Sequence, residues 1–360
     1  MKALIAAGGR ATRLRPITWT TNKHLIPLAN RPMLWHVIDK IVAAGIKDII
    51  VNVNQGELEM MQKALGDGAY WGAQITYLEQ KGGALGVAHV VANAEEHLRG
   101  HKFLFFLGDN IILGSINRFV ERFQNENLDC MLAFSKVKDP HRFGVPEFAG
   151  NGDLLRIIEK PEVPPSDYAV TGIYLYNEEY FDAFRTLTPS ARGEFEISDI
   201  NTWYIENRKT GYEEITGWWK DTGTPEALLE GNALVMDDLP RDTFRIKSDV
   251  PDGARLQGMV QVGENTRISS DCLIRGPVII GDNCAITDTY IGPYTAIGNN
   301  VKITNTEVEH SIVFDGAQID TTRRIVNSLI GLNATLRDVK QSHPRTGHQL
   351  IVGDNSFVEL

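Results

Sequence analysis

The sequence has few cysteines, no excess of positive charge and no long apolar run. Cys130, Cys272 and Cys284 lie far apart and form no CxxC pair, which excludes a disulfide framework and a cysteine zinc site and fits a reducing compartment. The formal net charge is −10, whereas nucleic-acid binders usually carry a basic stripe. No window approaches about 18 uninterrupted apolar residues, so no membrane-spanning segment and no membrane or nucleic-acid partner is expected.

The composition is that of an ordinary globular protein. The chain has 360 residues, of which 42% are hydrophobic and 23% charged, and this length suggests two or three domains. Met1 leads directly into the strand-like run ALIAA, without a charged and then apolar leader. We therefore expect a cytoplasmic protein that begins at its mature start.

Residues 1–240 alternate short apolar runs with helical patterns. The runs MKALIAA, IKDIIVNVN, QITYLEQ and KFLFFLGDN predict strands, and PMLWHVIDKIVAAG, LEMMQKAL and ALGVAHVVANAEEHL predict helices. This alternation indicates an α/β domain with a Rossmann-like mixed, mostly parallel sheet. Ligands of such sheets bind beyond the carboxyl ends of the strands, where Gly8, Gly9 and Asp109 are expected.

Residues 241–360 follow a six-residue period instead. The period predicts a hexapeptide-repeat, left-handed parallel β-helix with aliphatic residues stacked inside. It slips by one residue before Ile291 and becomes less regular after Glu309, where the pairs Ile330/Leu336 and Val352/Val358 keep it and the end is expected to cap the solenoid. The residues on the period are Val250, Leu256, Val262, Ile268, Ile274, Ile280, Ile286, Ile291, Ile297 and Ile303.

The opening stretch AAGGRATRLRP combines glycines with basic residues. Glycine lets backbone N–H groups approach phosphate oxygens, and Arg13 and Arg15 add the charge that grips phosphate. Lys23, in TTNKHLIP, can fold back over the same loop. Taken alone, this stretch is equally compatible with a turn that carries solvated arginines.

The longer motifs are more specific. GGRATRLRPIT and TNKHLIPLANRPM, followed by LGDN, FGV, IEKP, YAVTGIYLY, SARGEFEISDIN and WWKDTG, resemble in order the signature of the sugar-nucleotide nucleotidyltransferases over residues 1–235. Within this family, the YAVTGIYLY and SARGEFEISDIN blocks are similar to those of the glucose-1-phosphate thymidylyltransferases. The added β-helix makes the chain resemble the long form of these enzymes. The resemblance implies Mg²⁺-dependent transfer of a nucleotidyl group from dTTP to glucose 1-phosphate, giving dTDP-glucose and pyrophosphate.

The resemblance also implies roles for individual residues. Asp109 and Asp221 match the two Mg²⁺-binding carboxylates, a ligand type that Mg²⁺ prefers. Arg13 matches the basic residue that contacts the leaving pyrophosphate. Lys23 matches the basic residue that contacts the α-phosphate and the sugar phosphate. The remaining nucleotide-binding residues implied are Gly8, Gly9, Thr12, Gln80 and Gly86. The sugar-phosphate-binding residues implied are Gly144, Glu159, Lys160, Val170, Thr171 and Trp219. Outside these motifs, Asp109 or Asp221 could simply cap a helix or form a turn. Glu159 and Lys160 could form a surface turn, and Trp219 could be an ordinary core residue.

Four departures from the family pattern bear on activity and specificity. Ala11 replaces the third glycine, which would strain the loop by about 1 kcal/mol or more if the position needs positive φ and would be harmless if it needs only a small side chain. Asn22 precedes Lys23 in place of proline or serine, and Phe143 stands where tyrosine is common. The base-reading segment QKGGALG has unusual spacing, and Gln80 can pair with thymine or uracil.

Alternatives therefore remain open at the sequence level. The chain could be a UTP-using uridylyltransferase of the same fold, or a non-catalytic regulatory protein that binds a sugar nucleotide. For the β-helix we expect a role in homo-oligomerisation. The alternatives are a regulatory sugar-nucleotide site beside the catalytic domain, or an acyltransferase that uses His310 as its base.

Overall fold

The structure is a computed structural model that describes residues 1–9 and 11–338. The chain divides into two compact units, Met1–Thr243 and the part from Phe244 onward, and each is described by itself. The predicted positions Val352 and Val358, and the expected cap of the solenoid, lie outside the described residues. Over the described ranges, no helix is long and apolar enough to cross a membrane.

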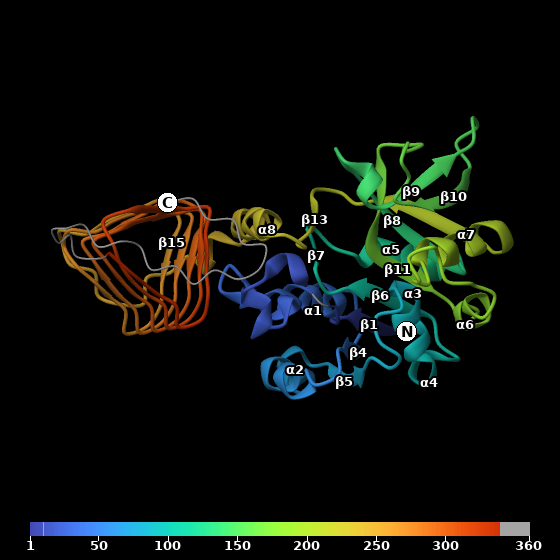
Figure 1. Cartoon of the computed structure of the whole chain (residues 1–360), viewed down its shortest axis with the longest axis horizontal. Helices are drawn as coiled ribbons and strands as arrows, with labels where there is room; N and C mark the ends of the chain where they lie inside the picture. Colours follow the sequence, from blue (N-terminus) through green and yellow to red (C-terminus); the bar gives the residue numbers. More distant parts are fainter. Residues whose placement is uncertain (10, 339–360) are drawn as a thin grey trace, which may run out of the picture. The chain divides into compact units, whose positions relative to one another are not determined.

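A seven-stranded mixed sheet forms the centre of the first unit (Figure 1). Strands β5, β4, β1 and β6 are neighbours and run parallel, β11 is antiparallel to both β6 and β8, and β12 is parallel to β8. The predicted mixed, mostly parallel sheet is confirmed. In sheet order the strands are β12 (Thr210–Glu214), β8 (Cys130–Lys136), β11 (Tyr168–Tyr176), β6 (Phe103–Leu107), β1 (Lys2–Ala6), β4 (Asp48–Val53) and β5 (Gln74–Glu79).

Apolar periodicity accounts for the helices of this unit. Helix α1 begins directly after Pro32, and its apolar residues at helical spacing, such as Leu34 and Ile38, are fully buried. The helix expected over ALGVAHVVANAEEHL is two helices, because the N–H of Ala94 bonds the carbonyl of Val91 and tightens the last turn of the first one. The α-helices are α1 (Met33–Ala43), α2 (Leu58–Leu65), α3 (Val87–Asn93), α4 (Glu95–Leu98), α5 (Asn117–Asn125), α6 (Tyr180–Phe184), α7 (Ile197–Asn207) and α8 (Pro225–Asp238).

Many of the predicted site residues lie on short strands and 3₁₀ helices outside the main sheet. The two-stranded sheets pair β2 (Pro27–Leu28) with β3 (Arg31–Pro32), β7 (Asn110–Ile112) with β13 (Trp219–Asp221), and β9 (Gly144–Phe148) with β10 (Leu154–Glu159). The 3₁₀ helices are η1 (Thr12–Leu14), η2 (Ile17–Trp19), η3 (Lys23–Leu25), η4 (Ala69–Trp71), η5 (Pro140–Arg142) and η6 (Arg241–Thr243).

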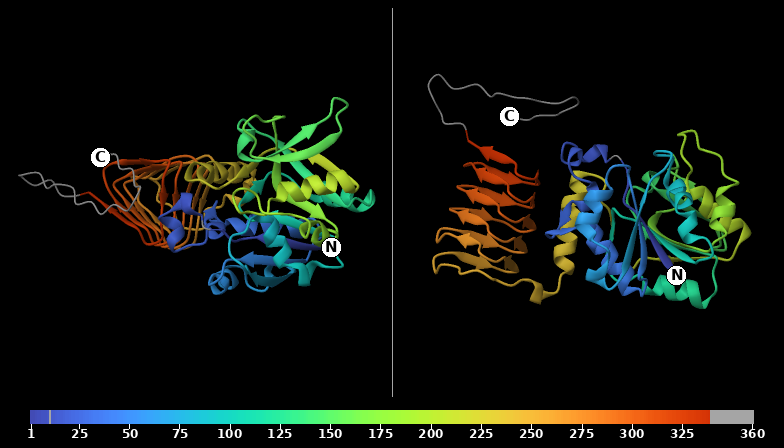
Figure 2. Two further views of the ribbon diagram at one scale, coloured as in Figure 1. Left: turned by 45° about the vertical axis from the view of Figure 1, so that its right-hand side comes forward. Right: turned by 90° about the horizontal axis from the view of Figure 1, so that it is seen from below.

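The second unit is the predicted β-helix, whose stacked coils are visible in Figure 2. Each coil contributes one strand to each of three parallel sheets, and the aliphatic residues of the six-residue period stack in the core. The slip before Ile291 has a simple cause, because the coil between Ile274 and Ile291 is one residue shorter than that between Val262 and Ile280, and both pairs stay in register.

Three sheets of five strands make up this solenoid. The first contains β14 (Arg255–Gln257), β17 (Leu273–Arg275), β20 (Tyr290–Ile291), β23 (Glu307–Glu309) and β26 (Arg324–Val326). The second contains β15 (Val260–Val262), β18 (Val278–Ile280), β21 (Thr295–Ile297), β24 (Ile312–Val313) and β27 (Leu329–Ile330). The third contains β16 (Arg267–Ile268), β19 (Ala285–Thr287), β22 (Lys302–Thr304), β25 (Gln318–Asp320) and β28 (Thr335–Arg337).

His310 occupies a corner of this solenoid. Its backbone is left-handed, with a φ of 45°, a conformation that most other such positions of the solenoid give to asparagine. Its Nδ1 lies 2.7 Å from Oδ1 of Asn327, and its ring stands edge-on to Tyr294. The His310 side chain is therefore part of the packing of this corner.

Candidate active site

A cavity of about 690 Å³ lies at the carboxyl ends of four neighbouring parallel strands. Because β6, β1, β4 and β5 run in the same direction, the residues that follow them gather at one edge of the sheet. Asp109 follows β6, Gly8 and Gly9 follow β1, Asn54 follows β4, and Gln80 follows β5. The predicted site residues that line the cavity are Gly8, Gly9, Lys23, Gln80, Gly86 and Asp109.

The Asn54 side chain holds the glycine loop. Its Oδ1 accepts a hydrogen bond from the Gly9 N–H at 2.9 Å, and its Nδ2 donates to the Gly9 carbonyl at 3.0 Å. A Cβ at Gly8 would approach the same Oδ1 to 2.9 Å, so the loop needs a residue without a side chain there. The Gly9 N–H is therefore directed at Asn54, and not at the cavity as the sequence led us to expect for a phosphate donor.

Ala11 adopts the left-handed conformation, with φ 43° and ψ 41°. Its carbonyl accepts a hydrogen bond from the Thr18 hydroxyl at 2.8 Å. An L-residue in this region is strained, so the substitution of the third family glycine is not merely a change of size. Thr12 and Arg13 follow on η1 with exposed side chains.

Lys23 and Asp109 form an ion pair beside this loop. The pair is largely shielded, with side chains 16% and 15% exposed. Burial opposes ionisation of Asp109, but the Lys23 ammonium outweighs it and holds the pKa of Asp109 well below its usual range. Asn22 caps η3 by accepting from the His24 N–H at 2.8 Å, and its Oδ1 also lies 2.8 Å from His24 Nδ1.

His24 is a fully buried neutral residue of the same wall. Burial, together with the charge of Lys23, lowers its pKa to about 3, although Asp109 acts in the opposite direction. Because Asn22 Oδ1 is an acceptor, the ring donates from Nδ1. The residue thus fixes the turn that carries Lys23 without adding charge to the cavity.

Strand pairing brings Asp221 to the same place. Strand β13 is antiparallel to β7, with Asp221 opposite Asn110, and the next residue, Thr222, donates its N–H and its hydroxyl to the Asp109 carbonyl at 3.0 and 2.8 Å. Burial raises the pKa of Asp221, and the negative charge of Asp109 raises it further, whereas Lys23 and Arg13 oppose the rise. The two predicted metal carboxylates therefore lie close enough to repel each other.

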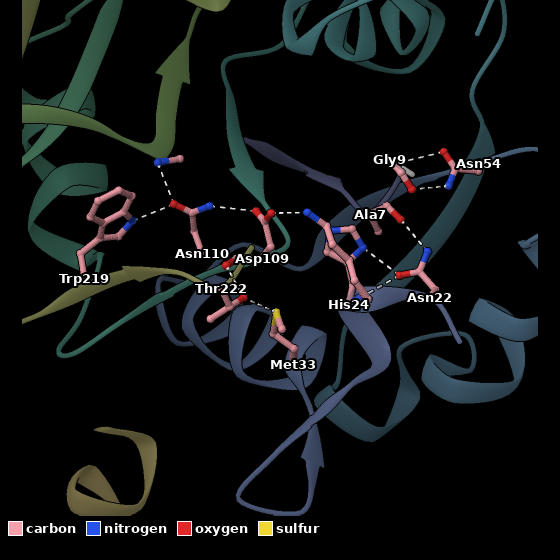
Figure 3. A network of polar contacts seen from close by, with 12 residues as sticks. Ala7, Gly9, Asn22, His24, Met33, Asn54, Asp109, Asn110, Trp219 and Thr222 are labelled. Atoms are coloured by element: carbon pink, nitrogen blue, oxygen red, sulfur yellow. Dashed lines mark hydrogen bonds and ion pairs between the residues drawn. The ribbon is translucent and has the colours of Figure 1, made fainter. Parts of the chain in front are cut away.

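Asn110 links the Asp109 carboxylate to Trp219 (Figure 3). Its Nδ2 donates to Asp109 Oδ1 at 2.9 Å, and its Oδ1 accepts from Trp219 Nε1 at 2.7 Å and from the Gly172 N–H at 3.1 Å. Trp219 also packs edge-on against Phe143, with ring centroids 5.2 Å apart. The predicted aromatic wall is thus hydrogen-bonded into the same network as the carboxylate.

Glu159 is the centre of a second charged group. It lies opposite Gly144 in the pairing of β10 with β9. Its Oε2 accepts from the Ser198 hydroxyl at 2.6 Å, and its Oε1 lies 3.1 Å from the Lys160 ammonium and 3.3 Å from the Arg192 guanidinium. A Cβ at Gly144 would meet the Ser198 hydroxyl at 2.7 Å, so glycine keeps the carboxylate accessible to that partner.

Two predicted sugar-site residues are interior instead. Val170 is 7% exposed and Thr171 fully buried on β11. The Thr171 hydroxyl donates to the Ala133 carbonyl of β8 at 2.9 Å. Both side chains therefore shape the sheet beneath the site.

Gln80 and Gly86 lie together at the other end of the cavity. Gln80 Nε2 lies 3.0 Å from His89 Nδ1 and donates to the Gly83 carbonyl at 3.4 Å. Gly86 has a φ of 99°, and a Cβ there would come within 2.5 Å of the Phe195 carbonyl oxygen. Only glycine allows the 80–86 segment to pack so closely against Phe195.

Comparisons with known proteins identify the family of the chain. The family description of nucleotidyl transferases matches residues 2–238. The chain belongs to the nucleotidyl transferase family. It is 41% identical to a glucose-1-phosphate thymidylyltransferase of Streptomyces antibioticus, over the whole chain and 99% of that protein. It is 37% identical to a low-salt glycan biosynthesis nucleotidyltransferase of Haloferax volcanii, over the full length of both.

A solved structure shares the fold of about two thirds of the chain. It is a crystal structure of a Bacillus anthracis protein assigned as a glucose-1-phosphate thymidylyltransferase, in complex with a sucrose. The two are 40% identical with a TM-score of 0.63, and the match covers 67% of this chain and 96% of the other. Nucleotidyl transferases act on a nucleoside triphosphate and a sugar phosphate and generally use a divalent metal.

The carboxylates of this nucleotidyl transferase suit such a metal. Within residues 1–9 and 11–338 no cluster of three or more acidic, histidine or cysteine side chains could hold an ion by itself. Mg²⁺ is commonly held by one or two carboxylates together with substrate phosphates, which is the donor set that Asp109 and Asp221 offer. Burial and then the negative charge of Asp109 raise the pKa of Asp221, and a bound divalent cation would favour the ionised form against both effects.

Several residues of this nucleotidyl transferase site were not identified from the sequence. His24 and Asn110 lie within quoted motifs, TNKHLIP and LGDN, and Arg192 lies in SARGE, so the motifs were their signal. Asn54 and His89 had no such signal, because their roles depend on contacts with residues distant in sequence.

Proposed function

We propose that the protein is a glucose-1-phosphate thymidylyltransferase, which transfers the thymidylyl group of dTTP to glucose 1-phosphate and releases pyrophosphate. The observation that carries this proposal is that one cavity combines an amide for a base, Gln80, with a largely shielded ion pair, Lys23 and Asp109. The full-length match to a thymidylyltransferase supports the choice of substrates.

The reaction needs alignment and charge neutralisation more than covalent help. An oxygen of the sugar phosphate forms a bond to the α-phosphorus, and the bond from that phosphorus to the bridging oxygen breaks, so the electron pair leaves with pyrophosphate. Lys23 would neutralise the α-phosphate and the incoming sugar phosphate, and Arg13 the departing pyrophosphate. When bound between Asp109 and Asp221, Mg²⁺ would supply additional positive charge to the phosphate oxygens.

The second charged group would hold the sugar phosphate. Lys160 would contact its phosphate, while Glu159 would accept hydrogen bonds from sugar hydroxyls. Trp219 would provide an aromatic wall, since it is fixed by Asn110 and Phe143. Phe143 in place of tyrosine offers packing at this wall without a hydroxyl for the sugar.

We further propose a cytoplasmic homo-oligomer assembled through the β-helix. All three cysteines are free and buried, which supports a reducing location. The regular solenoid offers flanks suited to self-association. Light scattering of the full chain and of a variant truncated before Phe244 tests this role, and an unchanged oligomeric state of the truncated protein would contradict it.

The decisive experiment measures pyrophosphate release with glucose 1-phosphate and Mg²⁺, comparing dTTP with UTP. We expect a clearly higher kcat/KM with dTTP. Equal values would indicate a dual-specificity pyrimidine enzyme, and a preference for UTP would indicate a uridylyltransferase. Absence of release with either nucleotide, from a protein that still binds sugar nucleotide, would favour a regulatory role.

A further inference from the structure

His89 lies directly behind Gln80, on helix α3 (Val87–Asn93). Gln80 Nε2 lies 3.0 Å from His89 Nδ1, and Asn93 Nδ2 lies 3.1 Å from the same nitrogen. Each of these amides also donates to a backbone carbonyl, Gln80 to Gly83 at 3.4 Å and Asn93 to His89 at 3.0 Å. The carbonyls fix which end of each amide is the NH₂ group.

The contacts define the state of the His89 ring. The Gln80 NH₂ group faces Nδ1, so Nδ1 accepts its hydrogen bond and the ring proton is on Nε2. Asn93 Nδ2 lies 3.5 Å from Nε2 as well as 3.1 Å from Nδ1, so it sits beside both ring nitrogens. Burial lowers the pKa of His89, which favours the neutral ring. Stacking on Phe195, with ring centroids 6.3 Å apart and planes 22° apart, holds the ring orientation.

The consequence falls on the other end of the Gln80 amide. Gln80 is 9% exposed, and its Oε1 is buried without a hydrogen-bond partner among the described residues. A buried carbonyl oxygen without a hydrogen-bond partner is costly. Gln80 lines the cavity, so a ligand N–H group that reaches Oε1 would give this buried acceptor its missing partner.

We propose that His89 is a positioning residue that locks the Gln80 amide with its NH₂ group turned inward, so that the nucleotide site selects bases that present a ring N–H. Thymine and uracil carry such a donor at N3, whereas cytosine has a bare acceptor nitrogen there. The inference rests on the proposed function, because it assigns this end of the cavity to the base. Loss of the Nδ1 acceptor leaves only the long 3.4 Å hydrogen bond to the Gly83 carbonyl to hold the amide, so the amide can rotate and offer its NH₂ group to cytosine.

The test compares dTTP with dCTP in the full-length protein. Leucine at this position fills similar space but cannot accept a hydrogen bond, so H89L is expected to reduce the ratio of kcat/KM for dTTP to that for dCTP at least tenfold. We expect this lower ratio to come from a change in KM for the nucleotides, while KM for glucose 1-phosphate stays unaltered. Asparagine places an acceptor oxygen near the position of Nδ1, so H89N is expected to restore most of the ratio.

H101L serves as the matched control, because His101 is an exposed histidine of the same unit and its replacement should leave the ratio unchanged. Binding of dTTP and dCTP is also measured by calorimetry, so that a folded variant of low activity still reports selectivity. An unchanged ratio in H89L, or a wild type that binds both nucleotides equally, would overturn the inference. Selective dTTP binding by a wild type that releases no pyrophosphate would overturn the proposed function alone.

Discussion

Replacement of Ala11 by glycine should stabilise the catalytic unit. Ala11 has φ 43° and ψ 41°, and an L-residue in this region carries a strain of about 1 to 2 kcal/mol. Glycine removes that strain but adds conformational freedom to the unfolded chain, which lowers stability by about 0.4 to 1 kcal/mol. We therefore expect A11G to raise the free energy of unfolding by about 0.5 to 1 kcal/mol.

The expected effect on activity is small. The alanine already holds the backbone in the conformation that glycine would adopt, and Thr18 secures its carbonyl. The value of kcat should therefore change by less than about twofold. Such a result would remove Ala11 as an argument for a non-catalytic regulatory protein.

The measurement can be confined to the unit that contains Ala11. All six tryptophans precede residue 243, so tryptophan fluorescence during urea unfolding of the full chain reports on the first unit. A233G is a matched control, because Ala233 lies inside helix α8 and its replacement should lower stability by about 1 kcal/mol. Destabilisation by A11G of the same size as by A233G would refute the conformational argument.

Three further changes test other contacts. D109N should lower kcat on the order of 10³ or more, since Asp109 pairs with Lys23 and is a proposed metal ligand; a drop of less than tenfold at saturating Mg²⁺ would contradict that role. N54A should lower kcat/KM for the triphosphate about tenfold, because two hydrogen bonds to Gly9 are lost; an unaltered value would show that the loop keeps its shape without them. Burial lowers the pKa of His36 to about 4 in the folded protein. As the pH drops below 6.5, His36 therefore takes up a proton in the unfolded state but not in the folded state, and the free energy of unfolding falls. H36Q should therefore lose about 2 kcal/mol less than the wild type between pH 7.5 and pH 5 in urea unfolding, and parallel losses would contradict the assignment.

The fold was predictable where a repeating pattern decides it. The β-helix follows from its six-residue period, and Ile274 pairs with Ile291 even where the period slips. The order of the strands in the main sheet was not predictable, because β11 inserts between β6 and β8 through pairings distant in sequence. The direction of β11 likewise depends on those partners and not on its own apolar pattern.

The site was predictable where residues lie inside motifs. The structure brings Lys23 and Asp109 together, as their motifs implied. Asn54 follows a predicted strand, but its role depends on the adjacency of β4 to β1, which places it beside Gly9. The left-handed conformation of Ala11 was one of two alternatives that the missing family glycine left open, and the sequence does not choose between them because alanine favours a different backbone region.

The charges of the site explain how an acidic chain can receive anionic substrates. Each charged cluster pairs a cation with a carboxylate, Lys23 with Asp109 and Lys160 with Glu159. A triphosphate or sugar phosphate that contacts one of these ammonium groups therefore competes with its carboxylate partner. A divalent ion that accompanies the triphosphate would take up Asp109 as Lys23 is released, so the ion and the nucleotide should bind cooperatively. Nucleotide affinity measured by calorimetry should rise when Mg²⁺ is present, and D109N should abolish that rise.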